Sequence, residues 1–222
     1  FDIPMQSPAR QGTNIIGELN PSNLSATPIL IGAHYDTVPG SPGADDNASG
    51  VVAMLECARA LSEGASGRRV VFVAFDAEEL QRPAQGLHGS TAYVSDLNPE
   101  DHPSAAIVFE SIGFSSSTLK QRLPGSFRLL FRRAYKALKS QNMNANSLLI
   151  LSKGDGRFIS RGLEQSASQP EIDLPLLPLE VPRWMPLVRN LRRSDHAPFW
   201  QAKIPAVMIS DTANFRNPHY HK

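Results

Sequence analysis

The chain alternates short, uninterrupted apolar runs with segments that have helical spacing. The clearest run is Arg69 to Phe75 (RVVFVAF), and similar runs occur at Pro28 to His34, Ala105 to Phe109, Ser147 to Leu151 and Ile204 to Ser210. Runs this short, rich in branched residues, are typical of strands buried on both faces. Five such strands between helices predict an α/β fold whose mixed, mostly parallel β-sheet is flanked by helices.

Three segments between these runs predict helices: about Ala48 to Gly64, Gly89 to Leu97 and Ser126 to Ser140 carry apolar residues at the spacing of one helical face. The other face of the last segment is cationic, with Arg128, Arg132, Arg133, Lys136 and Lys139. The whole chain has 22 Lys and Arg against 21 Asp and Glu. We therefore interpret this face as solvated helix surface and expect no nucleic-acid partner.

Composition limits the domain organisation. The chain has 222 residues, 41% of them hydrophobic, so it can bury one core, and we expect a single domain over residues 1–222. The lone Cys57 excludes an internal disulfide, and no apolar run approaches the roughly 20 residues of a membrane span. The chain begins at Phe1 without an initiator Met or a signal segment, so we expect that a preceding stretch is missing.

Acidic and imidazole side chains gather where the expected strands end. His34 and Asp36 follow the first strand, Glu78 and Glu79 follow the second, and Glu110 ends the third. Parallel sheets hold their ligands just beyond the carboxyl ends of the strands. Carboxylate and neutral imidazole without a thiolate cluster suit Zn²⁺, or less specifically Mn²⁺ or Co²⁺, and a divalent pair would neutralise the crowded carboxylates. A metal hydrolase is therefore our first interpretation.

Two further loops carry such groups. Gly43 to Gly50 (GADDNASG) contains Asp45 and Asp46, and Ser194 to Phe199 (SDHAPF) contains His196. We interpret Asp45 as the cap of the helix that follows it. The sequence has no HExxH helix of the kind that binds zinc in many metalloproteases, and its lack of a GxSxG elbow disfavours a serine hydrolase.

Six sequence blocks, in order, resemble the zinc peptidases of family M28, which include aminopeptidases and glutaminyl cyclases. The blocks are GAHYDTV (Gly32 to Val38), GADDNASG (Gly43 to Gly50), AFDAEE with GLHGS (Ala74 to Glu79, Gly86 to Ser90), FESIG (Phe109 to Gly113), SDHAPF (Ser194 to Phe199) and NPHYH (Asn217 to His221). The resemblance runs from about Asn14 to His221. It implies a fold like that of the zinc-dependent exopeptidases.

The resemblance also implies a site with two zinc ions, about 3.5 to 4 Å apart. In it, His34 and Glu110 bind one zinc, Asp46 bridges both, and Glu79 and His196 bind the other. Three protein ligands on each ion leave an open position for water, as in catalytic zinc sites.

Two other side chains would serve catalysis in this scheme. Glu78 would be the general base, and Asp36 would accept the second ring N–H of His34 and fix its tautomer. The family also has a cis peptide bond after the bridging aspartate, which here would join Asp46 and Asn47.

The sequence departs from the common family pattern in three places. Glu110 stands where most members have Asp, and the loop Arg82 to Gln85 is longer than usual. The chain stops at Lys222, so we expect the domain to lack its N-terminal lead-in and its last helix. His221, just before that end, is either part of an exposed tail or a wall of the substrate cleft.

The leading functional hypothesis is an aminopeptidase, in which a metal-bound hydroxide hydrolyses the N-terminal bond of a peptide or small amino-acyl substrate. One alternative is a cyclase-like acyltransferase with a single zinc on Asp46, Glu79 and His196, and another is a non-catalytic binding module. The apolar, Pro-rich segment Leu174 to Val188, with Trp184, either packs irregularly over the sheet or walls a substrate pocket. Because many relatives are exported, we also expect export.

Overall fold

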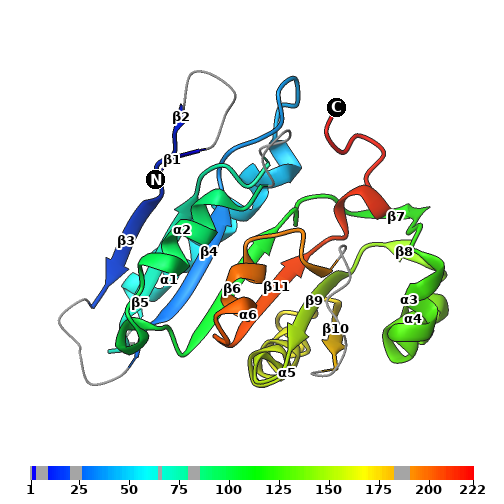
Figure 1. Cartoon of the computed structure of the whole chain (residues 1–222). Helices are drawn as coiled ribbons and strands as arrows, with labels where there is room; N and C mark the ends of the chain where they lie inside the picture. The colour runs from blue at the N-terminus through cyan, green and yellow to red at the C-terminus, as the bar shows by residue number, and fades with distance from the viewer. Residues whose placement is uncertain (1, 4–9, 21–26, 65–66, 80–85, 183–190) are drawn as a thin grey trace.

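The computed structural model describes residues 2–3, 10–20, 27–64, 67–79, 86–182 and 191–222. A seven-stranded sheet crosses the molecule in the order β10-β9-β11-β6-β4-β5-β3 (Figure 1). Its strands are β3 (Ile15–Leu19), β4 (Ile29–His34), β5 (Val70–Phe75), β6 (Ala105–Glu110), β9 (Leu148–Lys153), β10 (Leu176–Val181) and β11 (Ala206–Ser210). The neighbours β5, β4, β6 and β11 are parallel, β10 is parallel to β9, and β3 and β9 pair antiparallel with β5 and β11. The mostly parallel, mixed α/β sheet is confirmed.

Helices cover both faces of this sheet (Figure 1). They are α1 (Gly50–Glu63), α2 (His88–Asp96), α3 (Gly125–Leu130), α4 (Arg132–Ser140), α5 (Gly156–Ala167) and α6 (His196–Gln201), with short turns η1 (Ala44–Ser49), η2 (Pro99–Asp101) and η4 (Ala213–Phe215). The short strands β1 (Asp2–Ile3) and β2 (Arg10–Gln11) pair with each other, as do β7 (Ser116–Lys120) and β8 (Asn144–Ala145). None of the described helices has the length and apolar character that crossing a bilayer requires.

The continuous apolar run of β5 serves both faces of the sheet. Val71, Val73 and Phe75 pack in one cluster with residues of α2 and α6, while Val70 and Ala74 pack in another with residues of α1. Successive side chains of a strand point to opposite faces, so a strand covered twice must be apolar throughout. Because β5 is packed on both faces, the loop that carries Glu78 and Glu79 begins at a fixed position.

Two strands of the seven-stranded sheet were not expected from the sequence. β3 and β10 are the edges of the sheet. In β3, Ile15 and Ile16 are exposed, and β10 contains Pro178, which edge strands tolerate. Of the two alternatives left open for Leu174 to Val188, irregular packing over the sheet is therefore wrong for the part that forms β10. The rest of that segment from residue 183, with Trp184, and the loop Arg82 to Gln85 lie outside the described residues.

The segment expected to form one helix, Ser126 to Ser140, forms two. Phe131 lies between α3 and α4 with φ −124° and ψ 56°. Its buried ring lies 5.2 Å from that of Phe127, and both rings pack in one cluster with residues of β9 and β10. Phe127 and Phe131 stand four residues apart, the spacing of one helical face, so both rings enter the same core cluster on either side of the break.

We expect Phe75→Ala to lower the free energy of unfolding by about 3–5 kcal/mol, because it removes a fully buried ring. That ring packs against Tyr93 and Phe199, with centroid distances of 6.0 and 6.3 Å. Urea denaturation followed by circular dichroism measures the loss. Phe158→Ala, the same change at a ring that is 76% exposed, should stay within about 0.5 kcal/mol, and equal losses would contradict the packing described here.

Candidate metal centre

The parallel strands β4, β5 and β6 bring their carboxyl ends to one edge of the sheet. In the register, His34 pairs with Phe75 and Ala33 pairs with Phe109. His34 therefore lies beside the start of the loop that carries Glu78 and beside Glu110. The register thus brings these strand ends together at one edge of the sheet.

The first group of convergent ligand atoms consists of His34, Asp46 and Glu110. The Nε2 atom of His34 lies 3.2 Å from Oδ1 of Asp46 and 3.4 Å from Oε2 of Glu110. All three atoms are buried, and none has a hydrogen-bond partner in the described part of the chain. Buried polar atoms normally have partners, so three unpartnered ligand atoms that face one another fit a cation between them.

The second group consists of Asp46, Glu79 and His221. The Nε2 atom of His221 lies 3.1 Å from Oδ2 of Asp46 and 2.7 Å from Oε1 of Glu79. The two carboxylate oxygens of Asp46 are thus divided between the groups, Oδ1 in the first and Oδ2 in the second. This division is the arrangement that a carboxylate bridging two cations requires.

The loop around Asp46 is fastened to β6 by the next residue. The side-chain amide of Asn47 donates to the carbonyl oxygen of Phe109 at 3.0 Å, and its Oδ1 accepts from the N–H of Ser111 at 3.0 Å. The peptide bond between Asp46 and Asn47 is cis, as the family resemblance implied. Asn47 therefore holds Asp46 against the strand that carries Glu110.

The carboxylates of the centre influence one another strongly. Burial, together with the charge of Asp46, raises the pKa of Glu79 to about 9, and burial also raises the pKa of Glu78 well above its usual range. Burial acts to lower the pKa of His34, but Glu110 and other carboxylates outweigh it, so this pKa is raised. Two divalent cations would relieve this crowding of negative charge, so the residues present fit Zn²⁺.

Asp36 connects His34 to the loop that carries Glu78 and Glu79. Its Oδ1 atom lies 3.4 Å from Nδ1 of His34, whose closer neighbour is the backbone oxygen of Asp36 at 3.1 Å. The two carboxylate oxygens of Asp36 accept the N–H groups of Glu78 and Glu79, each at 3.0 Å. Asp36 is thus placed to orient both the imidazole and the acidic loop.

The structure corrects the assignment of His196, which belongs to neither group. His196 is buried in α6, its Nε2 atom lies 3.1 Å from the carbonyl oxygen of Leu191, and its ring meets that of Trp200 edge-on at 4.4 Å. Burial lowers the pKa of His196 to about 4, which keeps the ring neutral. The histidine of the second group is instead His221, which the sequence analysis left open as tail or cleft wall.

A second correction concerns Asp45, which caps no helix. Its Oδ1 accepts from the N–H of Gly113 at 2.9 Å, and its Oδ2 accepts from Nδ2 of Asn217 at 2.8 Å. Asp45 thus ties the chain end that carries His221 to the loop that carries Asp46. The NPHYH block contains both Asn217 and His221, but nothing in its spacing indicates that Asn217 contacts Asp45.

We expect Glu110→Ala to weaken metal binding at the His34 group while the Glu79 and His221 group stays filled. The loss should be at least about 100-fold, because mutating mere outer-shell partners already costs about 10- to 100-fold. Titration with zinc in a competing chelator measures each affinity. Unchanged affinity at both groups would remove Glu110 from the ligand set.

Comparisons with known proteins identify the family of this chain. The model of peptidase family M28 matches residues 14–160. The Escherichia coli (strain K12) protein YfbL, itself uncharacterised, is 30% identical over 224 residues, which cover 94% of this chain and 62% of that protein. The chain thus spans less than two thirds of that relative.

Solved structures show the same similarity. BSAP, a zinc aminopeptidase from Bacillus subtilis, superposes with a TM-score of 0.66 at 27% identity, over 98% of this chain and 44% of that one. A Tannerella forsythia glutaminyl cyclase superposes with a TM-score of 0.57 over 97% of this chain and 70% of that one, and its 19% identity shows the fold alone. The family match extends over well more than half of the sequence and includes four of the five residues in the two ligand groups. The chain belongs to peptidase family M28.

Proposed function

We propose that this protein is a zinc-dependent aminopeptidase that hydrolyses the N-terminal bond of peptides and binds two Zn²⁺ ions per chain. The observation that carries the proposal is the division of the two Asp46 oxygens between two groups of ligand atoms. A shared carboxylate of this kind suits a two-metal hydrolase better than an enzyme with one metal. Similarity to the zinc aminopeptidase BSAP supports the same reading.

In this proposal His34 and Glu110 hold one zinc, Glu79 and His221 hold the other, and Asp46 bridges them. Zinc bound here would polarise the scissile carbonyl and lower the pKa of a coordinated water toward ~7. The protein side chains fix the ligand geometry, exclude bulk water through burial, and move the proton.

Glu78 is the proposed general base. It is only 8% exposed and belongs to neither group of ligand atoms, so its carboxylate is free for proton transfer. Its N–H is held by Asp36, which also contacts the ring of His34. Glu78 would take a proton from the attacking water as the C–O bond forms and return it to the leaving amine as the C–N bond breaks.

A glutaminyl cyclase with one zinc is the second candidate, because peptidase family M28 includes glutaminyl cyclases as well as aminopeptidases. The two functions differ in metal count and in chemistry. A cyclase transfers the acyl group to the substrate's own α-amine and releases ammonia, so it consumes no water. All three ligands of the His34 group are present in this chain, which favours the hydrolase.

Elemental analysis of protein purified without chelator, combined with a peptide assay, tests the proposal. We expect close to two zinc ions per chain, release of free N-terminal amino acids, and loss of activity on chelation that zinc restores. One firmly bound zinc together with cyclisation of N-terminal glutamine would overturn the proposal in favour of the cyclase. Absence of both activities at full zinc occupancy would leave a binding module.

A further inference from the structure

Residues 111–154 contain eight Lys and Arg and no Asp or Glu. The rest of the chain has fourteen Lys and Arg against all 21 Asp and Glu. The near-neutral total therefore conceals a strong separation of charge along the sequence. A separation of this size creates a local positive potential that the net charge of +1 does not reveal.

The fold gathers most of this positive charge in one place, which we call the cationic lobe: β7, the 121–124 connection, α3, α4 and β8 (Figure 1). Its exposed cations are Lys120, Arg122, Arg128, Arg132, Arg133, Lys136 and Lys139. Helix α4 buries Ala134 and Leu138 and directs its charged side chains outward. Among the described residues no carboxylate forms an ion pair with any of these cations.

The cationic lobe adjoins the chain end that carries His221. The N–H of Arg122 donates to the carbonyl oxygen of Phe215 at 2.6 Å. A further exposed cation, Arg193, donates to Oδ1 of Asn214 and to the hydroxyl of Tyr220, both at 3.3 Å. The ring of Tyr220 stacks on that of His221 at 3.8 Å. Positive charge therefore reaches from α4 to the edge of the metal centre.

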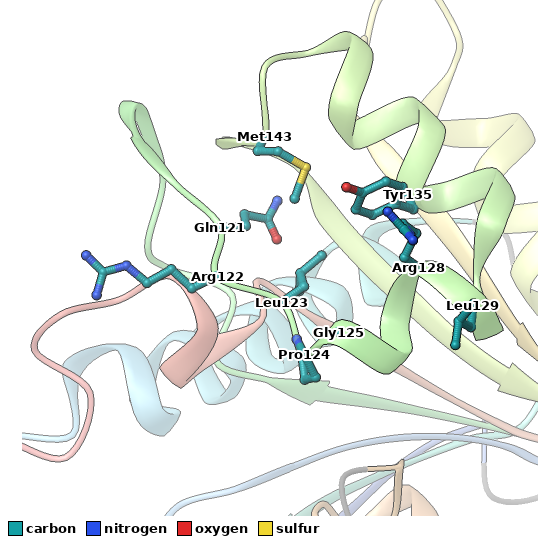
Figure 2. Close-up of a pocket in the computed structure, with 9 residues that line it drawn as sticks. All are labelled: Gln121, Arg122, Leu123, Pro124, Gly125, Arg128, Leu129, Tyr135 and Met143. Carbon is teal, nitrogen blue, oxygen red and sulfur yellow. The ribbon is translucent and has the colours of Figure 1, made fainter.

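The surface of the cationic lobe is also hollowed. A hollow of about 440 Å³ lies there, lined by Gln121, Arg122, Leu123, Pro124, Gly125, Arg128, Leu129, Tyr135 and Met143. In Figure 2, Arg122 extends away from the other labelled side chains, so the guanidinium groups of Arg122 and Arg128 do not converge on one point. Spaced cations beside a partly apolar hollow suit an extended chain with several negative charges better than one small anion.

We propose that the cationic lobe binds acidic side chains of the peptide substrate, beyond the residue that is removed, and so selects acidic peptides. This inference rests on the proposed aminopeptidase function. A peptide bound with its N-terminus at the metal centre must extend out of the site across its rim. On the side of Tyr220 and Phe215, that rim is formed by the cations described above.

Two other polyanions fit the cationic lobe less well. Single-stranded nucleic acid needs several exposed aromatic rings on which successive bases stack, whereas Phe127 and Phe131 are buried and Tyr135 is half-buried. An interfacial helix needs an apolar face for the membrane, whereas the exposed face of α4 is formed by Arg132, Arg133, Lys136 and Lys139, and the exposed Leu119 and Leu129 lie on two other elements, β7 and α3. An acidic peptide needs neither feature.

The first test measures binding without catalysis. An N-acetylated, fluorescent peptide rich in glutamate has no free amine to process and can be titrated into the zinc-loaded protein. We expect saturable binding at 0.1 M salt that is lost at 1 M salt, since the Debye length falls from roughly 10 Å to roughly 3 Å. An uncharged peptide of the same length should not bind. No binding of the acidic peptide at 0.1 M salt would overturn the inference, whether or not the enzyme is an aminopeptidase.

Charge reversal locates the binding surface. R133E/K136E, on the exposed face of α4, should weaken binding of the acidic peptide about tenfold or more. R157E/K203E makes the same change of charge at the end of the sheet that lies away from the metal centre. There Gly156 contacts the backbone of Ala206 at the start of β11. This control should bind as the wild type does, and equal weakening by both variants would refute a local site.

The second test joins binding to catalysis. For the zinc-loaded enzyme, the ratio of kcat/KM for a peptide with glutamates after its first two residues to that for the glutamine analogue should exceed one. The ratio should fall toward one in R133E/K136E and stay high in R157E/K203E. A ratio of one in the wild type would overturn the inference while leaving the aminopeptidase proposal intact. Tighter binding of an oligo-dT strand, or of phosphatidylserine–phosphatidylcholine vesicles, than of the acidic peptide would also overturn it.

Discussion

Glu78→Gln is expected to keep both zinc ions and to lose turnover by about 10²- to 10⁴-fold, the usual contribution of a general base. The amide has nearly the same shape as the carboxylate but cannot accept a proton. Since Glu78 is buried and belongs to neither group of ligand atoms, its replacement should leave the ligand geometry unchanged. The loss should appear in kcat, with KM changed much less.

Steady-state kinetics on a neutral peptide, together with elemental analysis of the same preparation, separate this effect from metal loss. Glu63→Gln, the same change at an exposed residue of α1, is the control and should match the wild type in both measurements. If Glu78→Gln lost zinc, Glu78 would be a ligand, and the roles of the adjacent acidic pair would be reversed.

The central strands could be predicted from the sequence because burial on both faces leaves a local trace. β5 and β4 are continuous apolar runs since each has a covered face on either side. The edge strands leave no such trace. β3 exposes Ile15 and Ile16, and β10 contains Pro178, so each becomes a strand only through its neighbour in the sheet.

The residues of the metal centre also differ in how far the sequence predicts them. Glu79 and Glu110 could be predicted as neighbours because parallel topology forces strand ends together. His221 could not, because its position depends on contacts with residues far away in the sequence. His196 was misplaced although a signal existed: Ala197 to Trp200 is apolar, which indicates a helix packed into the core rather than a loop at a polar site.

The chain end with His221 owes its position to a buried anchor. Arg216 lies 3.6 Å from the carboxylate of Asp211 and donates to the carbonyl oxygen of Ser147 at 2.8 Å. Burial raises the pKa of Asp211 to about 7, opposed by Arg216. With Asn217 on Asp45, the anchor fixes the backbone four to five residues before His221. A chain end held this firmly can supply a metal ligand.

His221→Ala is therefore expected to weaken the second zinc by at least about 100-fold, so that at limiting zinc the chain retains one ion instead of two. The first ion should stay, because His34 and Glu110 are unaffected. Peptidase activity should fall with the second ion. Zinc titration against a competing chelator gives the two affinities separately from activity.

Two matched histidine variants decide what that result means. His219→Ala changes an exposed residue two positions earlier and should leave both affinities as they are. His196→Ala should also keep both zinc ions but lower the free energy of unfolding by about 3 kcal/mol, because it opens a cavity beside Trp200. The opposite pattern, with zinc lost in His196→Ala and retained in His221→Ala, would restore the ligand set expected from the sequence. Loss of zinc in both would require that α6 and the chain end hold the centre jointly, because a ligand role alone would not make both histidines necessary.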